Sequence, residues 1–258
     1  MRIFGVESML KIGMMMGSPY VGVFCAANEN LAILPEATDP WVKADLQEAL
    51  GVDVLCTYLA GSVLIGSLAS MNSNGIVVTN FADKSELKRL PKDLRVGIME
   101  EKLNAAGNNI LANDHGAYVN LNASRSSVKI IEDTLGVEVL RRTIACIDTV
   151  GSVAIVTSKG IVCHPRTSQN ELEEISAFFK VPAALATLNY GTPYLGACAV
   201  ANSKGAYIGG KSTPIELGKL EDGLGYTDVV GYSENSQISV PSSGRSSDEK
   251  STSLPTLT

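Results

Sequence analysis

Short apolar runs come in pairs along this chain, and a polar turn joins the two members of each pair. The turns read "MNSNG" (71–75), "ANDHG" (112–116), "VTSKG" (156–160) and "ANSKG" (201–205), with a degenerate copy, "AANENL", at 26–31. The last positions of these turns, 31, 75, 116, 160 and 205, are 44, 41, 44 and 45 residues apart. Because the flanking runs are short and rich in β-branched residues, they predict five β-hairpins.

A helix signal follows each hairpin. The segments are "ATDPWVKADLQEALG", "DKSELKRL", "SRSSVKIIEDTLG", "TSQNELEEISAFF" and "STPIELGKLEDGLG". Asp83 and Glu86 have the spacing of a capping box, and Pro91 predicts an early end for the second helix. Gly51, Gly136 and Gly225 stand where a helix would end in the left-handed conformation. A further apolar run follows four of the five helices, so the predicted unit is strand, turn, strand, helix, strand.

One such unit is too small to bury both faces of its sheet, so neighbouring units must complete the core. No convincing strand follows the fifth helix, whereas "RIFGVES" (2–8) precedes the first hairpin as a surplus strand. The simplest arrangement lets 2–8 complete the last unit and close a ring without free edges. The predicted fold is therefore an α/β five-bladed ring with pseudo-five-fold symmetry. It forms a single domain over 1–226, and 227–258 is predicted to be a flexible, serine-rich tail.

Composition narrows the classes of partner. The chain has 21 basic and 27 acidic residues, a net charge of −6, so it lacks the cationic excess that bare nucleic acid would require. An acidic surface suits a basic protein surface better. The five cysteines show no metal-ligand spacing, and Glu7 and Lys11 interrupt the apolar stretch of a signal peptide, so we expect a cytoplasmic protein with reduced thiols and no bound metal. The uncharged segment 181–203 contains Pro182 and Pro193, which argues against a membrane span.

Several stretches resemble the archaeal translation initiation factor 6 family. They are "SPYVGVFCAANENLAILP", "MNSNGIVVTNF", "KLNAAGNNILANDHGAYV", "IEDTLGVEVLRRTIA", "SKGIVCHPRTS" and "NYGTPYLGACAVANSKGAYIGG". The resemblance runs in order from residue 1 to about 226. It implies the pentein fold, which agrees with the repeat count. It also implies that the protein binds the large (50S) ribosomal subunit, prevents that subunit from joining the small subunit, and takes part in large-subunit maturation.

The resemblance further implies a monomer without a cofactor that binds the ribosome through polar residues in turns and at strand entrances. The acidic composition makes ribosomal proteins the expected principal partner and rRNA the secondary one. The candidate ribosome-binding residues are Asn72, Ser73, Asn74, Gly107, Asn108, Asn109 and Asn113. Side-chain amides can donate and accept at a mixed protein–RNA surface. A structural alternative stays open, in which Asn72 only starts its turn and Asn108 only caps a strand.

The alternative function is a pentein-fold enzyme that modifies guanidino groups. Such an enzyme needs a nucleophilic cysteine and a histidine in contact. His115 is predicted to be an exposed turn residue, and Cys163 and His164 are adjacent in a strand and point to opposite faces. Cys25 and Cys198 are predicted to be core residues, which leaves only a pair across two repeats open.

A second alternative is nucleotide binding. The stretch "GAYIGGKS" (205–212) matches the phosphate-loop pattern formally, but its middle is predicted to lie in a strand, where its amides cannot surround a phosphate. The sequence therefore favours a binding protein over an enzyme.

Overall fold

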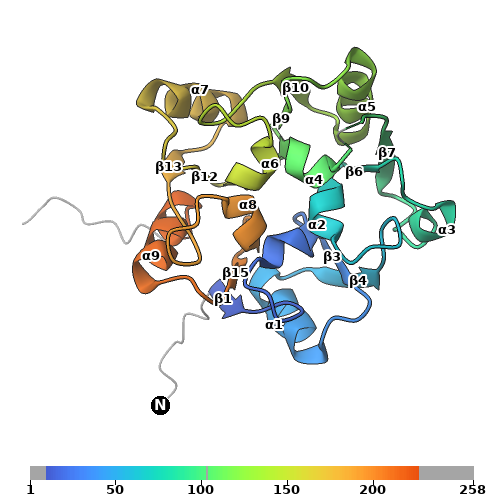
Figure 1. Cartoon of the computed structure of the whole chain (residues 1–258), viewed down its shortest axis with the longest axis horizontal. Helices are drawn as coiled ribbons and strands as arrows, with labels where there is room; N and C mark the ends of the chain where they lie inside the picture. Colours follow the sequence, from blue (N-terminus) through green and yellow to red (C-terminus); the bar gives the residue numbers. More distant parts are fainter. Residues whose placement is uncertain (1–9, 103, 227–258) are drawn as a thin grey trace, which may run out of the picture. The chain divides into compact units, whose positions relative to one another are not determined.

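The computed structural model describes residues 10–102 and 104–226, and within them five three-stranded sheets are arranged in a ring (Figure 1). The hydrogen-bonded order within each sheet runs from the ring axis outward. The sheets are β2 (Ala26–Ala27), β3 (Leu31–Pro35) and β4 (Asp53–Thr57); β5 (Ala69–Met71), β6 (Gly75–Thr79) and β7 (Arg95–Met99); β8 (Ile110–Ala112), β9 (Gly116–Val119) and β10 (Glu138–Arg141); β11 (Ala154–Val156), β12 (Ile161–Cys163) and β13 (Ala183–Leu185); and β14 (Ala199–Ala201), β15 (Ala206–Gly209) and β1 (Leu10–Gly13).

In each sheet the first two strands form an antiparallel hairpin, and the third pairs in parallel with the second. The helix that follows the second strand of each sheet in the chain is an outer helix. The outer helices are α1 (Pro40–Leu50), α3 (Lys84–Leu87), α5 (Arg125–Leu135), α7 (Gln169–Phe179) and α9 (Pro214–Gly223). We call each sheet with its outer helix a blade and number the blades from the N-terminal hairpin. The fold class predicted from the repeats is confirmed.

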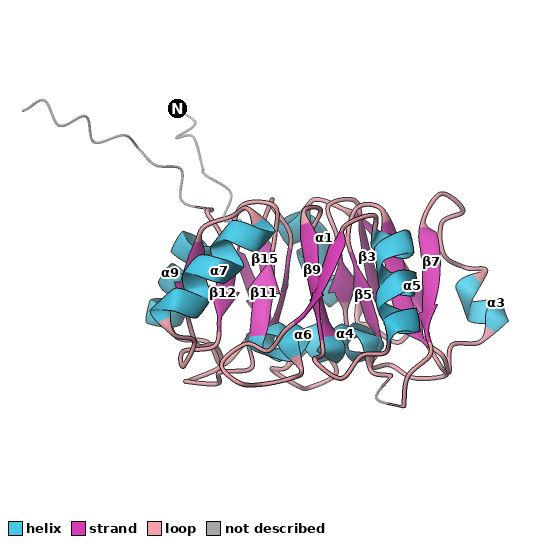
Figure 2. Cartoon of the chain, turned by 90° about the horizontal axis from the view of Figure 1, so that it is seen from above, coloured by secondary structure: helices cyan, strands magenta, loops and turns pink. Residues whose placement is uncertain are grey.

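A second set of short helices surrounds the ring axis. These inner helices are η1 (Val21–Val23), α2 (Ile65–Leu68), α4 (Ala106–Asn109), α6 (Val150–Val153) and α8 (Leu195–Cys198). Figure 2 shows α4 and α6 at one edge of the ring, with the strands running away from them. The ring therefore has two faces. The helix face carries the inner helices and the starts of the outer helices, and the turn face carries the hairpin turns.

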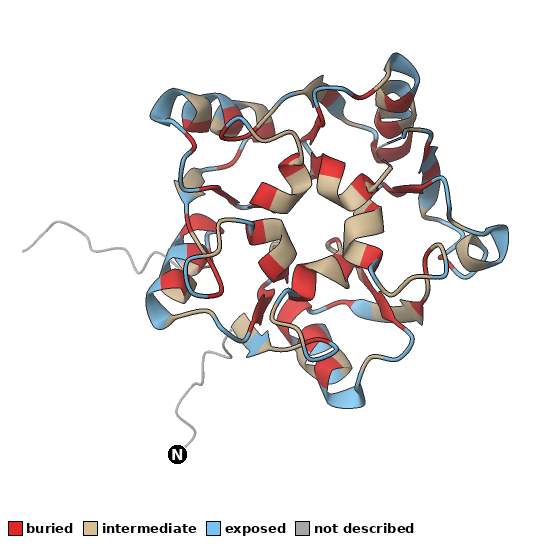
Figure 3. Ribbon diagram, viewed as in Figure 1, coloured by how far each residue is buried: buried red, intermediate tan, exposed pale blue. Residues whose placement is uncertain are grey.

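The inner helices were not predicted from the sequence, because "VLIGSLAS" (63–70) and its counterparts, the first apolar runs of the predicted hairpins, have the composition of continuous strands. Each run instead starts as one helical turn and continues as a short strand. A glycine in each turn explains the close packing around the axis. A Cβ atom on Gly66 would overlap the carbonyl oxygen of Gly22, and the same relation links Gly107 to Gly66, Gly151 to Gly107, Gly196 to Gly151 and Gly22 to Gly196. The contacts form a closed ring that excludes a side chain at these five positions. Figure 3 shows the inner helices gathered around the axis, with their residues buried or partly buried.

The outer helices begin and end largely as predicted. Asp83 and Glu86 form a complete capping box, and Gly51 and Gly136 end α1 and α5 with positive φ. α3 has only 4 residues, and Pro91 follows it. Five apolar clusters fill the spaces between blades; for example, Leu46 and Leu50 of α1 pack with Tyr207 of β15. The core thus depends on contacts between neighbouring blades.

The ring is closed by β1, which pairs in parallel with β15 and begins at Leu10. The closing strand predicted at 2–8 lies outside the described residues, as does the predicted tail over 227–258. The strand that the described structure uses for closure is therefore farther along the chain than predicted. The domain limits of 1–226 stay a prediction.

Candidate functional site

The turn face is built from five equivalent hairpin turns. In four of the turns the first residue is an asparagine, whose side-chain oxygen accepts hydrogen bonds from the main-chain amides two and three residues later. In the remaining turn, that of blade 4, the hydroxyl of Thr157 accepts the two equivalent bonds. This geometry is an Asx-turn, which small polar side chains stabilise. It explains why the same turn recurs in every repeat.

The side-chain amides of these asparagines link four of the five pairs of neighbouring blades. Asn28 donates to Asn72 O at 2.7 Å, Asn72 to Asn113 O at 3.1 Å, Asn113 to Thr157 O at 3.1 Å, and Asn202 to Asn28 O at 3.1 Å. We call this set the amide ring. Thr157 has no side-chain amide, and the Tyr226 hydroxyl donates to Asn202 O at 2.6 Å in its place. All these side chains are buried.

Three members of the amide ring also bind the end of an outer helix. Asn72 donates to Leu135 O, Asn113 to Phe179 O and Asn202 to Leu50 O, at 2.9, 3.2 and 2.9 Å. These carbonyls belong to the last residues of α5, α7 and α1, whose helices leave them without intrahelical donors. The buried amides therefore hold the fold together.

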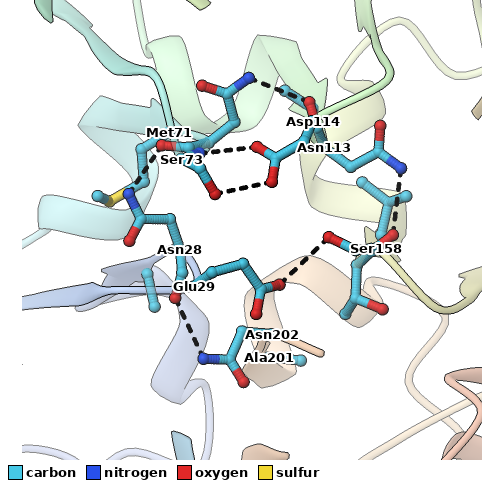
Figure 4. Close-up of a pocket in the computed structure, with 14 residues that line it drawn as sticks. Asn28, Glu29, Met71, Ser73, Asn113, Asp114, Ser158, Ala201 and Asn202 are labelled. Atoms are coloured by element: carbon cyan, nitrogen blue, oxygen red, sulfur yellow. Dashed lines mark hydrogen bonds between the residues drawn. The ribbon is translucent and has the colours of Figure 1, made fainter. Parts of the chain in front are cut away.

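A small polar cavity lies inside the amide ring, with lining residues from all five turns (Figure 4). Asp114 accepts two hydrogen bonds from Ser73, and Glu29 accepts hydrogen bonds from Ser158 and from Ser203. The cavity volume is about 30 Å³, which holds about two water molecules. A cavity of this volume is too small for a substrate-sized molecule, and its lining includes no cysteine or histidine.

The structure divides the predicted site residues between the two faces. Asn72, Ser73, Asn74 and Asn113 lie on the turn face. Gly107, Asn108 and Asn109 form part of α4 on the helix face.

Only part of this second group is available for contact. Asn109 is buried and accepts a hydrogen bond from the Asn120 amide. Asn108 is half-buried, and no hydrogen bond of its side chain is found within the described part of the chain. Asn108 is therefore the predicted amide that is most available for contact.

Tight turns precede four of the inner helices on the helix face. Residues at their tips have positive φ, including the non-glycine residues Met16, Ala60, Ala145, Cys146 and Tyr190. This conformation is strained for non-glycine residues. Carboxylates of the outer helices hold three of the turns: Glu86 accepts from the Ala60 and Gly61 amides, Glu171 from the Ala145 amide, and Glu216 from the Tyr190 and Gly191 amides.

Glu216 is buried, and burial alone would raise the pKa of its carboxyl group. Hydrogen bonds from Thr213, Gly191 and Thr187 outweigh that effect and lower the pKa below its ordinary value. The carboxylate therefore stays ionised and holds its turn.

Large apolar side chains are exposed mainly on the helix face. Tyr190 is 84% exposed, and Met16, Tyr20, Leu64 and Tyr194 are each at least 40% exposed. All five lie in the tight turns or directly before an inner helix. Within the described ranges no large apolar side chain is exposed in a hairpin turn of the opposite face. Such a gathering of exposed apolar and aromatic residues is typical of a protein–protein contact.

These exposed residues were not predicted from the sequence. A run such as "LNYGTPYLG" (188–196) contains apolar and turn residues in equal measure, and nothing in it tells whether its tyrosines are buried. Exposure of Tyr190 depends on the tight turn at the blade boundary, which places the residue at the surface.

The thiols and imidazoles do not form a reactive pair in the described structure. Cys25, Cys163 and Cys198 are buried, as predicted for Cys25 and Cys198, and burial raises the pKa of the Cys163 thiol to about 12 and that of Cys198 to about 11. His115 is exposed, as predicted. His164 is buried and accepts a hydrogen bond from the Arg166 amide through Nδ1. "GAYIGGKS" contains β15 (Ala206–Gly209), so its middle is a strand, as predicted.

Over residues 10–102 and 104–226, no group of three or more histidine, cysteine, aspartate or glutamate side chains could hold a metal ion. In the same part of the chain, every helix is too short or too polar to cross a bilayer.

Comparison with known proteins identifies the family to which the chain belongs. A family model described as the eIF-6 family matches residues 11–223. A protein of Thermoplasma acidophilum named translation initiation factor 6 is 44% identical over 207 residues, which cover 80% of this chain and 95% of that protein. Proteins of the same name from Haloquadratum walsbyi and Pyrococcus horikoshii are each 38% identical over 216 residues, covering 83% and 81% of this chain and 96% and 95% of the relatives.

Proposed function

Since the chain belongs to the eIF-6 family, we propose that it acts as a translation initiation factor by binding the large (50S) ribosomal subunit and preventing its association with the small subunit. Binding of this kind needs no chemical step. It needs a rigid body of sufficient size on the subunit-joining surface, and the ring, braced between all neighbouring blades, provides such a body. Blocking is then steric.

The observation that carries this proposal is the gathering of exposed apolar side chains on the helix face. Tyr20, Tyr190 and Tyr194 combine a rigid apolar ring with a hydroxyl group, which makes tyrosine a frequent anchor in protein interfaces. Asn108 lies in an inner helix of the same face, and its half-buried side chain forms no hydrogen bond with a described residue. We therefore assign ribosome contact to the helix face and assign Asn72 and Asn113 to the stability of the ring.

The chemistry of the partner follows from composition and surface. With 27 acidic and 21 basic residues, the protein gains little from neutralising phosphates, so ribosomal proteins are the principal partner and rRNA is the secondary one. The protein acts in the cytoplasm, as a monomer, where ribosomal subunits are available. A role in large-subunit maturation fits the same contact, because a factor that occupies the joining surface also marks a subunit as not yet ready to join.

We further propose that the protein is not an enzyme and needs no cofactor. Three of the five thiols are buried, and the axial cavity has space for about two water molecules only. A guanidino-modifying enzyme would need a substrate-sized pocket and a thiolate next to a histidine.

Co-sedimentation with purified subunits tests the proposed function. The protein should comigrate with large subunits, should not comigrate with small subunits, and should shift a mixture of the two from joined ribosomes to free subunits. Comigration with small subunits alone, or an unchanged peak of joined ribosomes at saturating protein, would show that the proposed function is wrong.

A further inference from the structure

Blade 2 differs from the other blades in its outer helix. α1, α5, α7 and α9 have 10 or 11 residues, whereas α3 has 4. The segment that follows α3 still seals the core, because Leu90 is buried and Leu87 and Leu94 pack against the same apolar cluster. In Figure 1, α5 lies beside β7, while α3 lies farther out at the rim of the ring. The short helix therefore leaves part of β7 without a cover.

Val96 and Ile98 of β7 are the apolar side chains left open, at 39% and 40% exposure. The strand register identifies the counterparts of Val96 in the other blades as Val54, Val139, Ala183 and Leu10. None of these four is exposed. The counterparts of Ile98 include Leu185 and Ile12, which are exposed as well, so the distinctive feature of blade 2 is an adjacent pair of exposed aliphatic side chains on one strand face.

The segment that leads into β7 is rich in cationic side chains, although the protein as a whole is acidic. Residues 83–95 contain five basic residues and three acidic ones, against 21 and 27 in the whole chain. Arg89 pairs with Glu36, and Arg95 donates to the carbonyls of Asn74 and Asp133.

Three lysines of the same segment have no carboxylate partner among the described residues. Lys84, Lys88 and Lys92 are exposed, and none of them forms an ion pair with a carboxylate of the described residues. The segment 83–95 thus carries more positive than negative charge, although the protein as a whole is negative.

We propose that Lys84, Lys88, Lys92, Val96 and Ile98 form a docking surface, the blade-2 surface, for an acidic amphipathic helix of a partner protein. The unpaired lysines are complementary to carboxylates of the partner, and Val96 and Ile98 are complementary to apolar side chains on the same partner helix. A helix fits because the space beside an outer strand holds a helix of 10 or 11 residues in the other four blades. Single-stranded RNA is disfavoured because its binding sites stack bases on aromatic rings, and this surface is aliphatic.

The blade-2 surface lies on the outer rim of the ring, away from the inner helices that we assign to ribosome contact. A second partner could therefore bind while the factor is on the ribosome. The two contacts are separable by substitution.

The test uses the full chain and a fluorescent synthetic helix of about 14 residues, with leucines on one face and glutamates on the other. The peptide should bind saturably. Lys88→Glu/Lys92→Glu should weaken binding by at least about tenfold, whereas the matched control Lys159→Glu/Lys219→Glu should change it by less than about twofold. Val96→Thr should also weaken binding, whereas Ile12→Thr, at the edge strand of another blade, should not.

Four results would overturn the proposal. The first is that the peptide does not bind saturably to the unchanged protein. The second is that the control lysine substitutions weaken peptide binding equally. The third is that a single-stranded oligouridylate binds more tightly than the peptide and that Lys88→Glu/Lys92→Glu abolishes this binding. The fourth is loss of co-sedimentation with large subunits in the Lys88→Glu/Lys92→Glu variant, because it would make the blade-2 surface part of the ribosome contact. Retained co-sedimentation together with lost peptide binding is the expected outcome.

Discussion

Gly66 packs directly against the main-chain carbonyl oxygen of Gly22, at a distance that leaves no space for a Cβ atom. The same contact repeats between each inner helix and the next until the ring closes. Five short helices can therefore surround one axis with their backbones in contact. A side chain at any of these positions would push two neighbouring blades apart.

Gly107→Ala should accordingly destabilise the ring. The added methyl group would overlap the Gly66 carbonyl, and overpacking of this kind costs about 1–3 kcal/mol of the free energy of unfolding. Gly218→Ala in α9 is the matched control, since no atom outside its own helix lies within 4 Å of the new Cβ atom there. That variant should be neutral or more stable by about 0.5–1 kcal/mol. Urea unfolding of both variants checks the prediction, and equal stability of the two would contradict it.

Asn72 and Asn108 should respond differently to the same change. Asn72→Asp replaces a buried amide that donates to Asn113 O and Leu135 O with a carboxylate facing two carbonyl oxygens, so the free energy of unfolding should fall by about 2–4 kcal/mol. Asn108→Asp should change it by less than about 0.5 kcal/mol, because that side chain is half-buried and bonds to no described residue.

Binding to the large subunit should be affected more by Asn108→Asp than by Asn72→Asp, the reverse of their effects on stability. Asn108→Asp should weaken large-subunit binding by about 1–3 kcal/mol in co-sedimentation titrations, through desolvation of a new charge. A stable Asn72→Asp variant that fails to bind would reverse our assignment of the two residues.

Alkaline pH should destabilise the protein through its buried phenols. Burial raises the pKa of Tyr226 above the ordinary value of 10.0, with the negative charge of Glu29 adding to the effect, and raises that of Tyr207 to about 12. A raised pKa means that the folded state favours the neutral phenol, so this stability is complete below pH 10.0 and is lost as pH rises above it.

Tyr226→Phe removes both the hydrogen bond of this hydroxyl and its titration, and the two losses can be measured at different pH values. It should cost about 1–2 kcal/mol at neutral pH, because the hydroxyl that completes the amide ring is lost. It should also make the fall in unfolding free energy above pH 10.0 shallower. Urea unfolding across alkaline pH measures both, and an unchanged slope in the variant would contradict the assignment.

Much of the ring could be predicted from the sequence because its signals are local. The turn spacing, the capping box at Asp83 and the helix-ending Gly51 and Gly136 depend on residues close together in the chain. The outer strands after four of the helices were predicted on the same basis. The resemblance to a family led to Asn108, which the structure leaves available on the helix face.

The features that the sequence did not reveal depend on contacts between blades. "VLIGSLAS" reads as a strand because of its valine, leucine and isoleucine, and only the neighbouring Gly22 carbonyl explains the helical turn at Ile65–Leu68. The hydrogen bonds of the buried Asn72 and Asn113 amides reach helix ends that lie 63 and 66 residues away in the chain. The role of Tyr226 depends on the lack of a side-chain amide at Thr157. Pairwise relations of this kind are not visible in a single repeat.

Alkylation of Cys146 tests most directly whether the helix face docks on the large subunit. Cys146 is an exposed thiol in a tight turn of the helix face, and His115 is exposed in a hairpin turn of the opposite face, so a His115→Cys variant reports on both faces of one molecule. Mass spectrometry after maleimide treatment gives the two rates. With large subunits at about ten times the Kd, alkylation of Cys146 should slow about tenfold, and that of the thiol introduced by His115→Cys should stay within about twofold of its rate in the free protein. Protection of position 115 with Cys146 unprotected, or protection of neither thiol, would contradict the account.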